Sequence, residues 1–128
     1  MKNTSARRER YLRDPLPIRL GGLAANLARI QSFSDHPGHR DAVVSLLEES
    51  KLFIEWTAPE ADPSVQALQV ECQRQLVRWH LVWNDIWSAP ARLAEVATHA
   101  GLWSQRLLET KHLLRLSPRP STFFGEVF

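Results

Sequence analysis

The pattern that most resembles a chemical site is Glu109-x-x-His112, which places a carboxylate and an imidazole about one helical turn apart. Di-iron sites in helical bundles use this spacing, together with a second such motif and two further inward-facing glutamates. At Glu71 the position of the second histidine is occupied by Arg74. A helical wheel also turns Glu109 and His112 away from the apolar face of their stretch. The sequence therefore predicts no metal site and no cofactor.

Nucleophilic chemistry has equally little support. Cys72 is the single cysteine and falls on an apolar helix face, where a buried thiol is normally inert. Phosphotransfer through His112 would need an exposed histidine in mid-helix, but Pro118 ends the predicted helix soon after it. Gly21-Gly22 lacks the preceding strand and the following Lys-Ser/Thr of a phosphate-binding loop. We therefore predict that the protein is not an enzyme.

The composition is that of an ordinary globular protein. The chain of 128 residues fits one domain, with 44% apolar and 23% charged residues. One cysteine excludes a disulfide within the chain and favours a reducing compartment, so we expect a cytoplasmic protein. No apolar run approaches the ~20 residues that a membrane span requires, so we expect no such span.

Charge is distributed unevenly along the chain although the net charge is only +2. Residues 1–33 carry seven basic and two acidic side chains, whereas residues 34–62 carry two basic and seven acidic ones. We expect the basic segment to lie beside the acidic one. The alternative is an arm at residues 2–13 that binds nucleic acid or another anionic surface, but aromatic residues are not interleaved with its arginines.

Apolar periodicity predicts an all-α fold. Helices are expected over about 17–33, 39–56, 63–87 and 90–114, and short turns between them imply an antiparallel up-down-up-down four-helix bundle. Asp62 and Pro63 predict a capping aspartate before a first-turn proline. Gly21-Gly22 is unfavourable within the first helix, at about 1 kcal/mol for each glycine. Either that backbone is closely approached, or the helix begins near Leu23.

The predicted domain organisation has three parts. Residues 1–14 form a basic arm, a loose segment or a short series of helical turns, which Tyr11 and Leu12 could hold against the body. Residues 15–116 form the bundle domain. Residues 117–128 form a Pro/Phe-rich tail, whose phenylalanines Phe123, Phe124 and Phe128 favour docking on the same chain or on a neighbour because each is costly to leave in water.

The stretch 63–87 contains a ladder of tryptophans. On a wheel of 100° per residue its apolar stripe contains Val65, Leu68, Cys72, Leu76, Trp79, Trp83 and Ile86. We therefore interpret Trp79 and Trp83 mainly as core. The alternative is that Trp79, Trp83 and Trp103 form a platform for a small apolar or aromatic ligand.

The opposite side of the same stretch carries Val70, Val77 and Leu81, with Arg74 beside them. A helix that buries one face in a bundle needs a partner for a second apolar row. A second copy, the tail or another protein could supply it, and we favour the second copy. The sequence thus predicts a non-enzymatic interaction or structural module that forms a homodimer. The predicted interaction residues are Val70, Arg74, Val77, Leu81, Phe123, Phe124 and Phe128.

Overall fold

The computed structural model describes residues 4–116, and this part of the chain consists of helices joined by short turns, with no strand. It contains six α-helices and two short 3-10 helices. Their bounds are α1 Thr4–Arg13, α2 Leu16–Phe33, η1 Pro37–His39, α3 Arg40–Thr57, η2 Ala58–Glu60, α4 Pro63–Leu81, α5 Trp83–Trp87 and α6 Pro90–Leu116. The all-α prediction is confirmed. The predicted tail, residues 117–128, lies outside the described residues.

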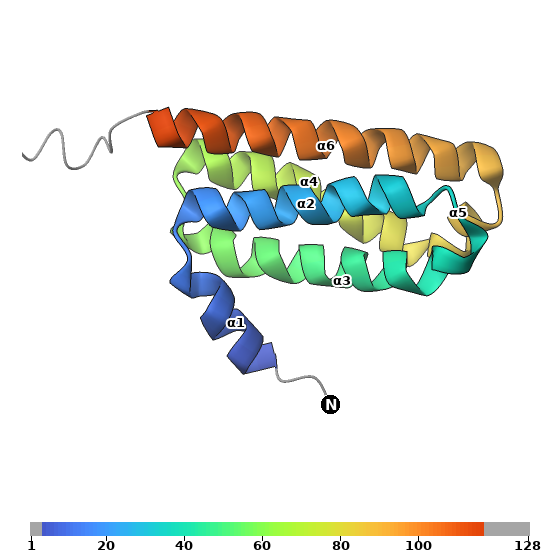
Figure 1. Cartoon of the computed structure of the whole chain (residues 1–128), viewed down its shortest axis with the longest axis horizontal. Coiled ribbons are helices and arrows are strands. Elements are labelled where there is room, and N and C mark those ends of the chain that lie inside the picture. Colours follow the sequence, from blue (N-terminus) through green and yellow to red (C-terminus); the bar gives the residue numbers. More distant parts are fainter. Residues whose placement is uncertain (1–3, 117–128) are drawn as a thin grey trace, which may run out of the picture.

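Four long helices make up the body of the molecule. Successive long helices α2, α3, α4 and α6 run in alternating directions, with α1 attached at one end and α5 at the other (Figure 1). α2 packs against both α3 and α6, whereas α4 makes its main contact with α3. Six helices stand where the sequence predicted four, because α1 is itself helical and the predicted third helix is divided.

Local sequence accounts for most helix ends. Pro17 stands in the first turn of α2, where a missing N–H costs nothing. α2 ends at Phe33, and the hydroxyl of the next residue, Ser34, donates to the Ile30 carbonyl at 2.6 Å. Asp62 and Pro63 begin α4 as predicted, but the Asp62 carboxylate makes no capping hydrogen bond. The predicted capping role of Asp62 is therefore wrong, although the helix start is correct.

The predicted helix over 63–87 is broken at Val82, and this is a correction. α4 ends at Leu81, Val82 has φ −115° and ψ 25°, and α5 resumes at Trp83. No glycine or proline marks the break. It coincides instead with tertiary contacts: Trp83 is buried, and Asn84 accepts a hydrogen bond from Arg40 at the start of α3. These contacts hold α5 across the end of the molecule.

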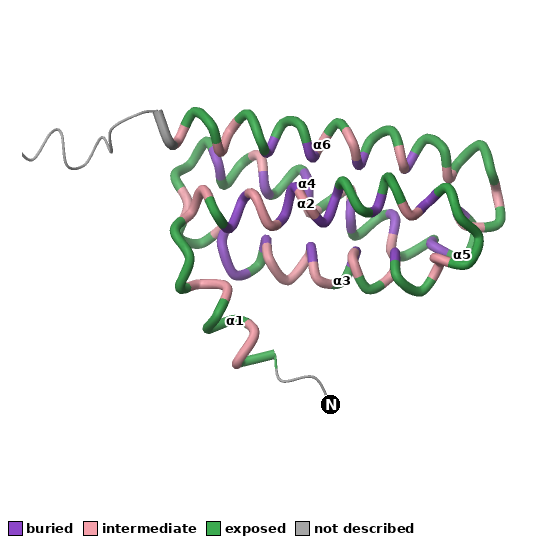
Figure 2. Tube along the Cα trace, viewed as in Figure 1, coloured by how far each residue is buried: buried purple, intermediate pink, exposed green. Residues whose placement is uncertain are grey.

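The core lies along the inward faces of the long helices (Figure 2). α2 is its centre, since Leu20, Leu23, Leu27 and Ile30 are all fully buried. The remaining buried core residues come from the other helices: Val43, Leu47, Ile54, Val65, Cys72, Leu76, Trp79, Trp83, Ile86, Val96, Ala100 and Leu107. The predicted stripe of α4 is confirmed, with Leu68 partly buried at its edge.

α2 packs most extensively against α6, and small residues are found along this contact. Ala24 and Ala100 are buried, and the buried Ser104 hydroxyl donates to the Ala24 carbonyl at 2.8 Å. A Cβ added at Gly21 would lie 2.8 Å from the Lys111 ammonium, the end of a flexible side chain. α2 begins at Leu16, so a helix start near Leu23 is excluded.

The predicted basic arm contains a ten-residue helix held against α3. The Tyr11 ring stacks on Phe53 with ring centroids 4.0 Å apart, and its hydroxyl donates to the Arg19 carbonyl at 2.9 Å. Arg7 forms an ion pair with Glu49 of α3 at 2.5 Å. Arg19 similarly lies 3.6 Å from Glu60. The expectation that the basic first segment lies beside the acidic second one is confirmed.

Candidate interaction surface

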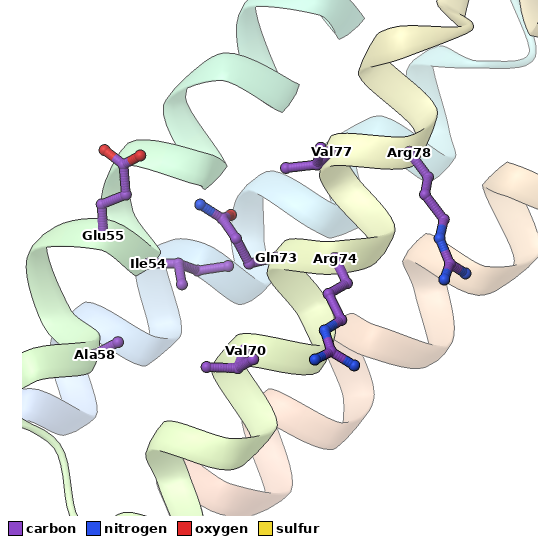
Figure 3. Close-up of a pocket in the computed structure, with 8 residues that line it drawn as sticks. All are labelled: Ile54, Glu55, Ala58, Val70, Gln73, Arg74, Val77 and Arg78. Carbon is purple, nitrogen blue, oxygen red and sulfur yellow. The ribbon is translucent and has the colours of Figure 1, made fainter.

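A groove of about 600 Å³ lies between α3 and α4. The apolar side chains that line it are Ile54 of α3, Ala58 of η2, and Val70 and Val77 of α4, and Gln73 lies between the two sides (Figure 3). Glu55, Arg74 and Arg78 complete the lining. These eight residues define what we call the α3–α4 groove. Three predicted interaction residues, Val70, Arg74 and Val77, belong to it.

The outer row of α4 is open to solvent, as the sequence predicted. Val70 is 44% exposed, Val77 39% and Leu81 79%. Val70 and Val77 stand inside the α3–α4 groove, but Leu81 lines a separate hollow with Arg40 and Asn84 at the end of α4. The row is therefore continuous along the helix, while the surface it forms with its neighbours consists of two hollows.

The two sides of the α3–α4 groove carry opposite charge. Glu55 stands on α3, and Arg74 and Arg78 stand on α4. All three are exposed, and none forms an ion pair within residues 4–116. Their charges are thus available to a partner at the surface.

Ser50 of α3 and Gln69 and Gln73 of α4 are buried or partly buried polar side chains, and together they are called the polar seam here. Ser50 and Gln69 are completely buried, yet the Ser50 hydroxyl and both polar atoms of the Gln69 amide lack a protein hydrogen-bond partner. Gln73 donates to the Lys51 carbonyl at 3.3 Å, while its own amide oxygen is buried without a partner. An unpaired buried polar group costs about 1–3 kcal/mol. These atoms therefore make no protein hydrogen bond that would strengthen the α3–α4 contact.

The structure does not place the three tryptophans of the predicted ligand platform around one cavity. Trp79 lines a hollow between α4 and α6, Trp83 lines the hollow beside Leu81, and Trp103 lines a third hollow on α6. Trp83 stacks at a tilt against Trp87, with ring centroids 5.8 Å apart. The Trp103 ring is covered by the Arg106 guanidinium at 4.5 Å. Trp83 and Trp103 thus each have a local partner, and the three rings line three different hollows.

Groups capable of acid, base or nucleophilic chemistry do not share one site, although His80 lies between Lys51 and Glu48, with its Nε2 3.9 Å from a Glu48 carboxylate oxygen. Cys72 is buried, and burial raises the pKa of its thiol to about 12. Glu109 and His112 are exposed on α6. His80 is held by Lys51, whose ammonium lies 2.7 Å from the imidazole Nδ1. Within residues 4–116 no three His, Cys, Asp or Glu side chains are grouped so that they could hold a metal ion.

The basic helix α1 uses part of its charge within the molecule. Arg7 binds Glu49, whereas Arg8, Arg10 and Arg13 are exposed.

The predicted site residues Phe123, Phe124 and Phe128 lie outside the described residues. Comparison with protein-family models, curated proteins and solved structures found no match to this chain. None of the described helices is sufficiently long and apolar to cross a membrane.

Sequence reasoning missed the contribution of α3 to the α3–α4 groove. Ile54 is buried and Glu55 is exposed, as expected of the inner and outer sides of one amphipathic helix. A helical wheel treats one helix at a time, so it cannot show that these residues border the row of Val70 and Val77. An antiparallel alignment of the two helices about their short connection could have paired them.

Proposed function

We propose that this chain is a non-enzymatic helical interaction module and that two copies associate through the outer face of α4. In this proposal α2, α3, α4 and α6 act together as a four-helix bundle, the rigid support for that face. The observation that carries the proposal is the exposed row of Val70, Val77 and Leu81 beside the α3–α4 groove. An apolar row flanked by charged residues is the kind of surface through which proteins associate.

The position of the row supports association rather than a packing accident. The opposite face of α4 already fills the core with Val65, Cys72, Leu76 and Trp79. The outer row lies outside this core, and its side chains remain 39–79% exposed. Burying such side chains against a second copy would remove apolar surface from water, at about 25 cal/mol for each Å².

The placement of the reactive groups supports a role without catalysis. General acid–base or nucleophilic catalysis needs at least two groups within hydrogen-bond reach of a common substrate atom. The Cys72 thiol is buried, His80 is paired with Lys51 and Glu48, and Glu109 lies on the exposed side of α6. The proposal therefore assigns no catalytic residue.

A double substitution tests the proposal. Val77→Arg with Leu81→Arg introduces two charges into the proposed interface, and a buried unpaired charge is strongly unfavourable. We expect the wild type to sediment as a dimer at high micromolar concentration and the variant as a monomer. Helical circular dichroism should be unchanged, since both side chains are exposed in the single chain.

The matched control places the same change on another helix. Leu102 and Leu113 of α6 are also exposed apolar residues, and neither lines the α3–α4 groove. Leu102→Arg with Leu113→Arg should leave the dimer intact. Equal dissociation of both double variants would show that added charge, rather than the face of α4, controls association, and it would reject the proposal.

A further inference from the structure

The charges along the α3–α4 groove point to the way in which two copies pair. We propose that the copies are related by a two-fold axis parallel to the groove, so that Glu55 of each copy meets Arg74 of the other. Arg78 lies one turn beyond Arg74 and adds a second positive charge to the α4 side of the groove. This inference rests on the proposed self-association and adds the identity and arrangement of the partner surface.

The argument begins with the self-complementarity of the groove. One side is acidic through Glu55 and the other is basic through Arg74 and Arg78. A rotation by 180° about an axis along the groove places α3 of one copy opposite α4 of the other. The two copies then form two equivalent sets of opposite-charge contacts, as an isologous interface requires.

The register of the two helices brings the charges to similar levels. The Gln73 amide donates to the Lys51 carbonyl, and the Gln66 amide donates to the Ala58 carbonyl at 2.8 Å. Interpolation between these contacts places Glu55 opposite the turn of α4 that contains Val70. Side chains on a helix lean toward its N-terminus, and the Arg74 guanidinium extends back along α4 toward that same turn (Figure 3).

The apolar residues are matched by the same rotation. Val70 and Val77 project from the α4 side of the groove, and Ile54 and Ala58 border it on the α3 side. With α3 of one copy opposite α4 of the other, Val70 of each copy lies near the level of the partly buried Ala58 of its partner, while Ile54 stays buried in its own core. Apolar contact at the centre and charge pairs at the edge are the usual arrangement of a protein interface.

The other symmetric arrangement is electrostatically unfavourable. A two-fold axis across the groove would place α3 against α3 and α4 against α4. With this axis at the level of Glu55, Glu55 would meet the Glu55 of the second copy, and the basic side of α4 would face the basic side of the second α4. Like charges brought together at an interface cost several kcal/mol. The charge pattern therefore selects the axis along the groove.

Charge reversal tests the pairing in the full-length chain. Glu55→Arg alone, or Arg74→Glu with Arg78→Glu, should raise the dimer dissociation constant at least about tenfold at low salt, because each creates like-charge contacts. The triple variant with all three changes restores opposite charges and should return to within about threefold of wild type. Glu109→Arg, the same charge change on α6, is the control and should leave the constant unchanged.

Sedimentation equilibrium separates failure of this pairing from failure of self-association. If Val77→Arg with Leu81→Arg dissociates the dimer but Glu55→Arg does not, self-association stands and the pairing is overturned. Lack of rescue in the triple variant overturns it as well. A wild type that is monomeric at every concentration rejects both, and dimers that form only after deletion of residues 117–128 would assign the groove to the tail.

Discussion

The α2–α6 contact and the α3–α4 contact are built on different principles. α2 and α6 meet through small residues and a satisfied hydrogen bond, with Ala24, Ala100 and Ser104 all buried. α3 and α4 meet through a polar seam in which Gln69 and Ser50 lack partners, and a groove with exposed valines remains above it. The first contact is complete within one chain. The second contact leaves polar groups without a protein hydrogen-bond partner and leaves apolar side chains exposed to solvent.

This difference indicates that the two contacts have different roles, the first in folding stability and the second in association. A helix pair packed through small residues supplies stability, because close approach increases dispersion contacts along the whole interface. A pair that leaves apolar surface exposed is less stable alone and gains more from a partner. We therefore expect substitutions in the first contact to change folding, and substitutions along the α3–α4 groove to change association.

The largest expected change in the free energy of unfolding comes from a substitution in the core of α2. Leu27 is fully buried at the centre of the core, so Leu27→Ala should lower the free energy of unfolding by about 2–5 kcal/mol. Val77→Ala in the groove should lower it by less than about 1 kcal/mol, because that side chain is 39% exposed. Urea denaturation of dilute monomer measures both. Equal losses of free energy of unfolding in the two variants would contradict this difference in roles.

The next largest change in the free energy of unfolding comes from the polar seam, and it is an increase rather than a loss. Gln69→Leu replaces an amide without partners by an apolar side chain of similar size, and it should raise the free energy of unfolding by roughly 1–3 kcal/mol. Leu76→Gln is the reverse change at a fully buried position of the same helix and should be destabilising. A destabilised Gln69→Leu variant would mean that the amide has a partner, such as a buried water.

The smallest effect concerns a glycine in α2. A Cβ at Gly22 would lie 3.9 Å from Phe53 and from Tyr11, an ordinary contact distance. Gly22→Ala should therefore raise the free energy of unfolding by about 0.5–1 kcal/mol through helix propensity. Thermal unfolding followed by circular dichroism measures it. A lower melting temperature would indicate that α1 needs the open space at Gly22 to pack against α3.

Features set by the periodicity of a single helix were accessible from sequence. The all-α class, the buried stripe of α4 and the exposure of Val70, Val77 and Leu81 all follow from residue types repeated at helical spacing. The start of α4 at Pro63 was also marked, because proline restricts where a helix can begin.

Features set by contacts between helices were not accessible in the same way. The break at Val82 has no local signal, and it is associated with the Arg40–Asn84 hydrogen bond between segments far apart in sequence. The place of Glu55 in the groove depends on the register of α3 against α4. α1 was only partly anticipated, since Tyr11 was recognised as an anchor but its stacking on Phe53 was not.

The central claim is that the outer face of α4 holds two copies together. Sedimentation equilibrium of the intact chain across low to high micromolar concentration, beside Val77→Arg with Leu81→Arg, tests it most directly. The account predicts a monomer–dimer equilibrium for the wild type and a monomer for the variant at every concentration. A wild type that remains monomeric throughout, or a variant that dimerises as the wild type does, would contradict it.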